Sequence, residues 1–206
     1  MAIVPRIAVL VSGSGTTLQN LIDRIEAGTL KAQIVLVIGS KLHIGAEPRA
    51  MSSDIPYETI DRKSFVDVAS YSRKVFELID QSQVDLVCMA GWLCLMQIPD
   101  KYRSKVMNIH PSLLPAFGGP RMFGRHVHEA ILQHGCKVSG CTVHLVDDTY
   151  DNGPIIVQRA VDIVDKETVD SLIKKVQEQE HIAYPQAITL FSTGKLKVEG
   201  RRTKMK

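Results

Sequence analysis

The sequence has few cysteines, and their spacing excludes several kinds of site. Its 206 residues include four, Cys88, Cys94, Cys136 and Cys141, and none forms a Cys-x-x-Cys pair. Cys88 and Cys94 lie in apolar sequence, so we expect reduced, mostly buried thiols, which are typical of a cytoplasmic protein. The pair at 136 and 141 has no second pair to complete a structural zinc site, and we expect no metal.

Long apolar runs and a leader segment are also lacking. No run reaches the roughly 18 apolar residues that a membrane-spanning helix needs. Residues 1–6 lack a basic flank, a long apolar stretch and a small-residue cleavage site, so they do not resemble a signal peptide. We expect a cytoplasmic protein with no membrane partner. Hydrophobic residues make up 45% and charged residues 23% of the chain, which favours a packed globular domain over disorder.

A net positive charge is found only at one end of the chain. The net charge is +3, but residues 194–206 contain six basic residues and one acidic residue, so the rest of the chain carries −2. Aromatic residues make up only 5% of the chain, and no basic stripe with interleaved aromatics occurs in its body. We therefore do not expect a nucleic-acid surface. The basic tail is expected to be a frayed, solvated terminus.

Apolar runs alternate with helical patterns along the whole chain. This alternation predicts an α/β fold, a mostly parallel twisted sheet with helices on both faces and a strand pair in its C-terminal half. The expected strands are residues 6–11, 34–38, 57–60, 86–90, 106–110, 138–146 and 155–161. The expected helices are residues 16–26, 45–53, 66–82, 128–134 and one from 167 towards 184, where Pro185 kinks or ends it.

A Gly/Ser loop, Ser12-Gly13-Ser14-Gly15-Thr16-Thr17, follows the first expected strand and opens the first helix. Free backbone N–H groups and the helix dipole favour an anion at such a place. The loop matches neither the P-loop pattern nor Gly-x-Gly-x-x-Gly, since Leu18 takes the place of the third glycine. A nucleoside triphosphate or a dinucleotide is therefore disfavoured, and the alternative is a plain turn.

The most informative segment runs from Asn108 to Pro115 and reads Asn-Ile-His-Pro-Ser-Leu-Leu-Pro. In an extended strand, Asn108 and His110 point to the same side, and Pro111 should end the strand just after them. A carboxamide that donates to a developing oxyanion, next to an imidazole that holds a proton, suits acyl transfer. The alternative is a strand end with a turn-forming Asn and a surface His.

This octapeptide, followed by His144 and by Asp151 in the run from His144 to Pro154, resembles the folate-dependent formyltransferases, in particular those that act on glycinamide ribonucleotide. The resemblance implies that Asn108, His110 and Asp151 are catalytic and that His144 supports Asp151 or its loop. It also implies a single formyltransferase domain over residues 1–206. Residues 1–105 would form a Rossmann-like, phosphate-binding half and residues 106–193 a catalytic and folate-binding half, with 194–206 as the basic tail.

The same resemblance assigns a substrate site. Gly15, Thr16 and Thr17 would bind the phosphate, with Thr17 in place of the usual Asn. Gln177 and Glu180, which share one helix face at i and i+3, would hold the ribonucleotide. Without the resemblance, a solvated polar helix face is the favoured interpretation of that pair.

A folate site is implied around the segment that follows the strand at 86–90. The residues implied are Trp92, Leu93, Cys94, Leu95, Met96, Asn108, Val146, Asp147 and Asp151. Cys94 and Val68 stand where relatives commonly carry basic residues. The loop from Phe117 to His128 resembles that of a longer-loop subgroup, and Arg121 and Arg125 are candidate cations in it.

The implied activity is formyl transfer from 10-formyltetrahydrofolate, as co-substrate, to the amine of glycinamide ribonucleotide. A tetrahedral intermediate is expected, with Asp151 favouring the charged form of His110. Partners would be small molecules, and the chain a monomer or homodimer. Formyltetrahydrofolate hydrolase, methionyl-tRNA formyltransferase and sugar-nucleotide formyltransferase are alternatives, but we expect 206 residues to leave no room for their additional domains. A non-catalytic nucleotide-binding module is a further alternative.

Overall fold

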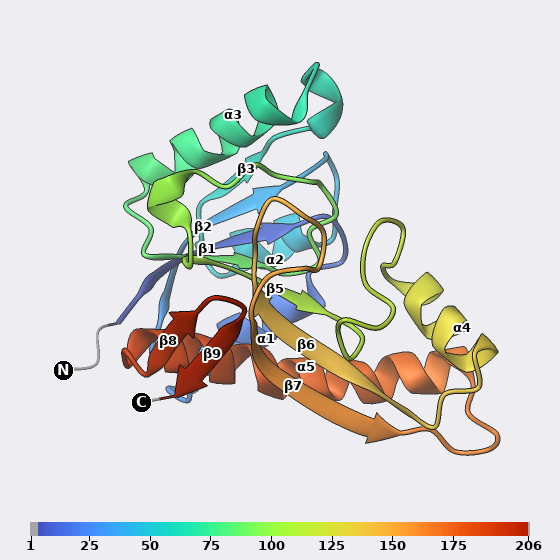
Figure 1. The fold of residues 1–206 in the computed structure, drawn as a ribbon. Coiled ribbons are helices and arrows are strands. Elements are labelled where there is room, and N and C mark those ends of the chain that lie inside the picture. The colour runs from blue at the N-terminus through green and yellow to red at the C-terminus, as the bar shows by residue number, and fades with distance from the viewer. Residues whose placement is uncertain (1–3, 206) are drawn as a thin grey trace.

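The computed structural model describes residues 4–205, and seven of its strands form one sheet (Figure 1). Their order is β3-β2-β1-β4-β5-β6-β7. The neighbours from β3 to β5 are parallel, whereas β5–β6 and β6–β7 are antiparallel. The strands are β1 (Arg6–Val11), β2 (Gln33–Gly39), β3 (Tyr57–Thr59), β4 (Leu86–Met89), β5 (Val106–His110), β6 (Val138–Leu145) and β7 (Ile155–Asp162). The predicted mostly parallel sheet with an antiparallel addition is confirmed.

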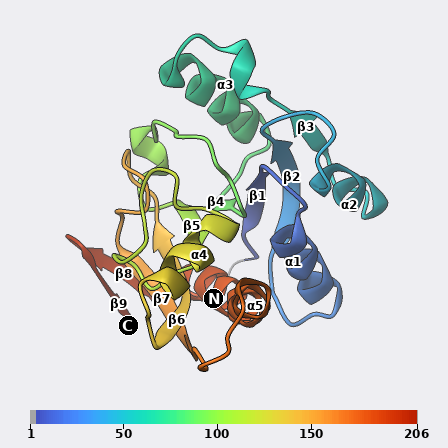
Figure 2. The same ribbon diagram turned by 90° about the vertical axis from the view of Figure 1, so that its right-hand side faces the viewer.

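Helices cover both faces of this sheet, and each face has its own apolar cluster (Figure 2). One cluster contains side chains of α1, α2, α4 and α5, and the other contains those of α3. The helices are α1 (Thr16–Glu26), α2 (Ala46–Ser52), α3 (Val68–Gln81), α4 (Arg125–Gln133) and α5 (Val169–Ser192), with short 3₁₀ turns η1 (Arg62–Ser64) and η2 (Asp100–Tyr102). No helix within residues 4–205 is both long enough and apolar enough to cross a membrane.

Helix α5 continues past Pro185 to Ser192, so the predicted range was too short. Pro185 is buried within the helix. The helix continues through it because packing against the sheet outweighs the loss of one backbone donor. Tyr184 is fully buried on the same helix, and its hydroxyl lies 3.0 Å from the carbonyl oxygens of both Met89 and Met107. These residues belong to β4 and β5, so α5 ties together the two strands that lead to the site.

Removing that hydroxyl should destabilise the fold. We expect Tyr184→Phe to lower the free energy of unfolding by about 1–3 kcal/mol, because it leaves buried carbonyl oxygens without their partner. Urea unfolding measures the change. Tyr150→Phe is the matched control, since water can replace the lost contact of a side chain that is 38% exposed. Equal stability of the two variants would contradict the role given to Tyr184.

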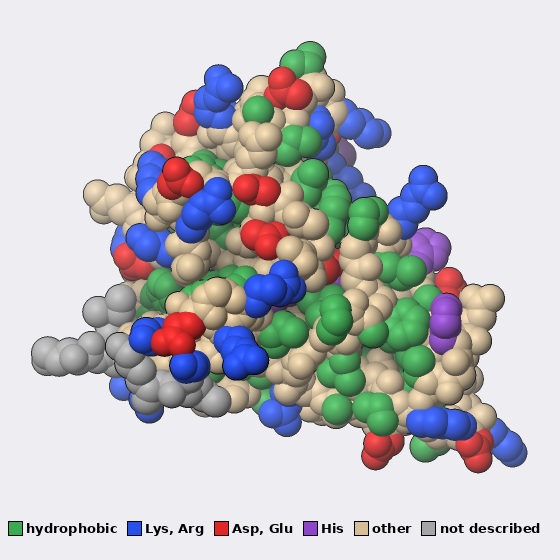
Figure 3. Space-filling model, viewed as in Figure 1, with side chains coloured by type: hydrophobic (Ala, Val, Ile, Leu, Met, Phe, Trp, Pro, Cys, Tyr) green, Lys and Arg blue, Asp and Glu red, His purple; other side chains and the backbone are tan. Residues whose placement is uncertain are grey.

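The basic tail is not frayed, so that expectation was wrong. Residues 196–205 form a separate antiparallel hairpin of β8 (Leu196–Glu199) and β9 (Arg202–Met205). Leu196 and Val198 pack against the core, while Lys197 and Lys204 both pair with Glu199. Figure 3 shows this mixture of basic and acidic side chains at the hairpin. Glu199 offsets only one of the tail's six positive charges, and the tail is held to the protein by its apolar residues.

Candidate active site

The sheet reverses its direction of growth between β1 and β4, and the loops that leave these strands meet there. The Ser12 N–H donates to the Gly91 carbonyl at 3.1 Å. The Ser12 hydroxyl accepts from the Leu93 N–H at 3.0 Å and from the Ser40 hydroxyl at 2.8 Å. Ligands of open α/β sheets bind outside the carboxyl ends of the strands at such a reversal point.

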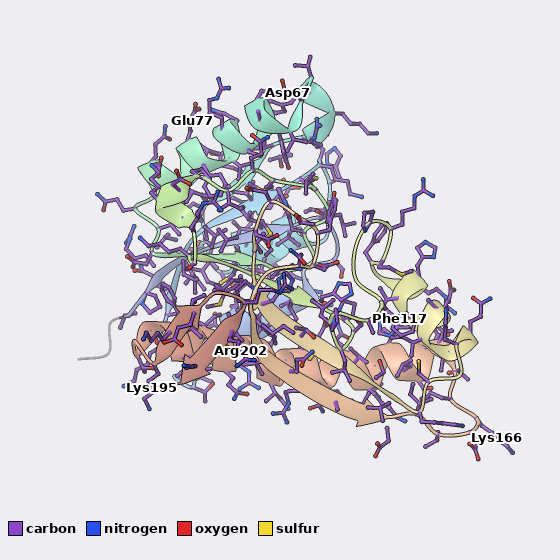
Figure 4. All side chains as sticks on the ribbon, in the orientation of Figure 1. Asp67, Glu77, Phe117, Lys166, Lys195 and Arg202 are labelled. Carbon is purple, nitrogen blue, oxygen red and sulfur yellow. The ribbon has the colours of Figure 1, made fainter. Side chains whose placement is uncertain are left out.

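Next to this point, β5 presents Asn108 and His110 on one side of the sheet. Asn108 pairs across the sheet with His144 of β6, and its Nδ2 atom lies 3.2 Å from His144 Nε2. His110 Nε2 donates to the Phe117 carbonyl at 2.8 Å, because a carbonyl oxygen only accepts. Phe117 is labelled beside α4 in Figure 4. The loop that follows the octapeptide therefore folds back onto the imidazole.

Asp151 reaches the same point from the loop between β6 and β7. One carboxylate oxygen lies 3.4 Å from His110 Nδ1 and accepts from the Gly119 N–H at 2.9 Å. The other lies 3.4 Å from Asn108 Nδ2 and 3.7 Å from His144 Nε2. The three side chains predicted to be catalytic thus contact one another, although 43 residues separate Asn108 from Asp151.

Opposing effects set the pKa of His110. Burial lowers the pKa of His110, whereas the Asp151 carboxylate and the Phe117 carbonyl act to raise it, and the net pKa lies below the ordinary value. Asp151 does favour the charged imidazole, as predicted, but desolvation outweighs it. Burial acts to raise the pKa of Asp151 as well. The contact with His144, the charge of His110 and the Gly119 N–H oppose this, so the pKa of Asp151 is lowered.

A cavity of about 610 Å³ opens over these side chains. It is lined by every residue predicted for catalysis, substrate binding or folate binding, so the fold gathers these residues around one space. They are Gly15, Thr16, Thr17, Trp92, Leu93, Cys94, Leu95, Met96, Asn108, His110, His144, Val146, Asp147, Asp151, Gln177 and Glu180.

One end of the cavity lies at the N-terminus of α1, where free backbone N–H groups and the helix dipole favour an anion. Helix α1 begins after Gly15, whose φ of 75° suits glycine, and no side chain caps the first turn of the helix. A Cβ atom at Gly15 would lie 2.8 Å from the Ala46 Cα atom, so a larger residue does not fit. Gln177 and Glu180 of α5 line the same cavity. Burial raises the pKa of Glu180 to about 7.

The other end is apolar, but its residues are not equally accessible. Trp92 is only 7% exposed and stacks on Tyr71 with ring centroids 6.1 Å apart. It therefore belongs largely to the core, while Leu93 is 45% exposed. Cys94 is half-buried and lines the cavity without supplying a charge. A flat ring at this end would meet main-chain groups and apolar side chains.

The two candidate cations are Arg121, in the loop before α4, and Arg125, the first residue of α4, and they are not equivalent. Both line the cavity. Arg125 is exposed and pairs with Glu129 at 3.0 Å and with Asp170 at 2.5 Å, so its charge is already neutralised by two carboxylates. Arg121, with a φ of 69°, has no ion pair among the residues that the structure describes. It is therefore the better candidate of the two.

The cavity is also lined by residues to which the sequence analysis gave no role, among them His128 and Tyr150. His128 of α4 is 3% exposed, and burial together with the charge of His110 lowers the pKa of His128 to about 4. Tyr150 precedes Asp151 and also lines the cavity. Tyr150 lies within the run from His144 to Pro154 and His128 at the end of the loop from Phe117, but neither residue type at these positions indicated a role in the site. Within residues 4–205, no three His, Cys, Asp or Glu side chains are grouped as a metal site requires.

Comparison with known proteins was made for the sequence and for the fold. The family model described as formyl transferase matches residues 5–188, which leaves β8 and β9 outside the match. The chain is 37% identical over 195 residues to the trifunctional purine biosynthetic protein adenosine-3 of Gallus gallus. This alignment covers 94% of the chain but only 19% of that longer protein.

Two relatives are similar to the chain over most of their own length. The phosphoribosylglycinamide formyltransferase of Escherichia coli (strain K12) is 33% identical, with 93% of this chain and 89% of the relative covered. The crystal structure of glycinamide ribonucleotide transformylase 1 from Symbiobacterium toebii superposes with a TM-score of 0.91 at 37% identity. That superposition covers 98% of this chain and 94% of the other.

Proposed function

This chain belongs to the formyl transferase family, and from that premise we propose that it transfers a formyl group from 10-formyltetrahydrofolate to the amine of glycinamide ribonucleotide. The observation that carries the proposal is the contact of Asn108, His110 and Asp151 within one cavity. The cavity also has an anion-binding end and an apolar end, which suit a ribonucleotide phosphate and a pterin ring.

The reaction needs an oxyanion donor and a path for one proton. The substrate amine attacks the formyl carbon, and the carbonyl oxygen becomes an oxyanion to which Asn108 Nδ2 donates. Such a donor typically contributes about 10²–10³ in rate. The C–N bond to the folate then breaks, and the proton lost by the amine is returned to the folate nitrogen. In our proposal His110 transfers this proton and Asp151 orients the imidazole.

Hydrolysis of the formyl folate is the alternative that the same three side chains could support, with water as the nucleophile. The anion-binding end of the cavity favours the ribonucleotide, because hydrolysis has no need of Gln177, Glu180 or the uncapped α1 terminus. The two reactions differ in their dependence on the acceptor.

The test is to measure tetrahydrofolate release with and without glycinamide ribonucleotide. We expect release that requires the acceptor and a formylated ribonucleotide formed in equal amount. Formate release at the same rate without the acceptor would show that the protein hydrolyses the formyl folate and does not transfer its formyl group. No turnover in either assay would contradict the proposal.

Glu180→Gln should weaken binding of the ribonucleotide while it stabilises the free protein. The carboxylate would accept hydrogen bonds from ribose hydroxyls, and the loss of a charged acceptor is worth about 1.5–3 kcal/mol. We therefore expect KM for the ribonucleotide to rise roughly 10- to 100-fold at pH 8. The folate KM should change little.

The same substitution should stabilise the free protein. The pKa of Glu180 is raised from 4.5 to about 7, so folding loses free energy as the pH rises between these values. Glutamine has no such loss, and Glu180→Gln should gain up to about 3 kcal/mol at pH 8 and nothing at pH 4. Thermal unfolding at both pH values measures this, with the exposed neighbour changed by Glu178→Gln as control. A less stable Glu180→Gln protein at pH 8 would contradict the burial of this charge.

A further inference from the structure

The loop that carries Asp151, residues 147–154, has a backbone that other parts of the molecule must hold in place. Asp151 has a φ of 52°, in the left-handed region that residues with a Cβ atom rarely adopt. Gly153 packs so closely that a Cβ atom there would lie 1.8 Å from the Leu145 carbonyl oxygen. This loop, called here the Asp151 loop, therefore has to be fixed at both of its ends.

One end is fixed by the segment between β4 and β5. Asp148 accepts from the Ile98 N–H at 2.9 Å and lies 3.6 Å from Arg103. Within the loop, Asp147 accepts from the Thr149 N–H at 2.9 Å and from Asn152 Nδ2 at 3.2 Å. The half of the loop before Asp151 is thereby tied to the body of the protein.

The other end is held by the C-terminal hairpin. Arg201, in the turn between β8 and β9, donates from Nη1 to Asn152 Oδ1 at 3.1 Å. Thr203 of β9 donates to the carbonyl oxygen of Ile155, the first residue of β7, at 2.6 Å. Figure 4 labels Arg202 of β9, which lies between Arg201 and Thr203 in the sequence. Both contacts span nearly fifty residues of sequence.

We propose that the hairpin β8–β9 positions Asp151 against His110, and that Arg201 and Thr203 are its positioning residues. The inference rests on the proposed function, because it gives the hairpin a part in the same reaction. Arg201 acts on Asn152, which directly follows Asp151. Both ends of the Asn152 amide are engaged, since its nitrogen donates to Asp147 while its oxygen accepts from Arg201.

The contact of Arg201 is exposed and that of Thr203 is partly buried, and a single hydrogen bond of either kind contributes only about 0.5–1.5 kcal/mol to overall stability. Their importance lies in where they act, since a small displacement of a catalytic group can cost up to about 10²-fold in rate. The hairpin bonds to Asn152, directly after the strained Asp151, and to Ile155, where the loop enters β7. The hairpin is therefore expected to affect the reaction more than the stability of the fold.

The test uses Arg201→Ala, Thr203→Val and the double variant, with Arg202→Ala as the matched control. Arg202 is an exposed residue of the same type in the same hairpin, and no side-chain contact of it with the loop is found within residues 4–205. We expect kcat to fall about three- to tenfold in each single variant and further in the double variant. Arg201→Lys should restore part of the loss.

Two further measurements separate positioning from a merely structural role. The pH dependence of kcat should shift in the Arg201 and Thr203 variants, since Asp151 would act less strongly on His110. Hydrogen exchange of the amides in residues 147–154 should accelerate in the same variants, without any need for activity. Melting temperatures close to that of the parent protein would exclude global unfolding.

The outcomes distinguish this inference from the proposed function. If the parent protein is active and the double variant has the same kcat, pH profile and hydrogen exchange as the parent, the positioning role is overturned. If the parent protein itself fails to transfer formyl groups, the proposed function falls. Hydrogen exchange then decides the inference by itself, with unchanged protection of the loop overturning it and lost protection supporting the hold on Asp151.

Discussion

Asp151→Asn is expected to lower kcat/KM for formyl transfer by about 10²–10⁴, the range of a positioned acid–base group. The amide keeps the shape of the side chain but removes the charge that lies 3.4 Å from His110 Nδ1. The Gly119 N–H and Asn108 Nδ2 would then compete for one remaining carbonyl oxygen. Both the orientation of the imidazole and its protonation should suffer.

The direction of the pH effect follows from the forces on His110. Burial lowers the pKa of this side chain, and the carboxylate of Asp151 acts against that lowering. Without the carboxylate, the pKa of His110 falls further, so the protonated form is lost at a lower pH. The limb of the pH–rate profile that reports this deprotonation should therefore move towards acid.

The control for this prediction is Asp147→Asn, which changes a carboxylate on the same loop and in the same cavity. Asp147 bonds to Thr149 and Asn152 within the loop, and within residues 4–205 it makes no hydrogen bond or ion pair with His110. It should cost less activity and leave the pH profile in place. Equal losses of activity and identical pH–rate profiles in the two variants would show that Asp151 has no special part in the proton transfer.

Asn108→Ala should lower kcat by about 10²–10³ with a much smaller change in the KM of either substrate. In the proposed mechanism Asn108 Nδ2 donates to an oxygen that becomes charged only as the transition state is approached. An interaction of that kind affects turnover more than ground-state binding. Single-turnover rates at saturating substrate would measure the effect.

Asn108→Asp sharpens this test, because it keeps the size of the side chain and replaces the donor by a carboxylate. It should be at least as damaging as alanine, since a negative charge would face the developing oxyanion. Turnover within about threefold of the parent for either variant would show that Asn108 is not the oxyanion donor. A loss confined to KM would make Asn108 a binding residue.

The candidate site shows how far local sequence information reaches. The period-two pattern places Asn108 and His110 on one side of a strand, and Pro111 marks its end, so β5 is predicted with the bounds that the structure has. The Gly/Ser loop before α1 is read in the same way, from turn chemistry and helical spacing. These predictions need only neighbouring residues, because backbone geometry repeats over short distances.

Other features depend on contacts between distant segments. No local pattern shows that Arg125 is neutralised by Asp170 of α5 or that Trp92 stacks in the core on Tyr71. The basic tail was misread for the same reason: its charge is evident in the sequence, whereas the packing of Leu196 and Val198 against the core is not. The chemistry of proline also predicted a kink or an end of the last helix at Pro185, whereas α5 continues to Ser192 with Pro185 buried.

The order and type of the seven strands of the main sheet and of helices α1 to α5 could be predicted from the sequence, and the resemblance of its motifs names the three side chains on which the proposed chemistry depends. Only the tertiary structure decided that these side chains contact one another, that burial outweighs Asp151 in setting the pKa of His110, and that a C-terminal hairpin reaches the Asp151 loop. The physical reason is that hydrogen-bonding periodicity acts between neighbours along the chain. Desolvation and charge pairing depend on which distant residues the fold brings together.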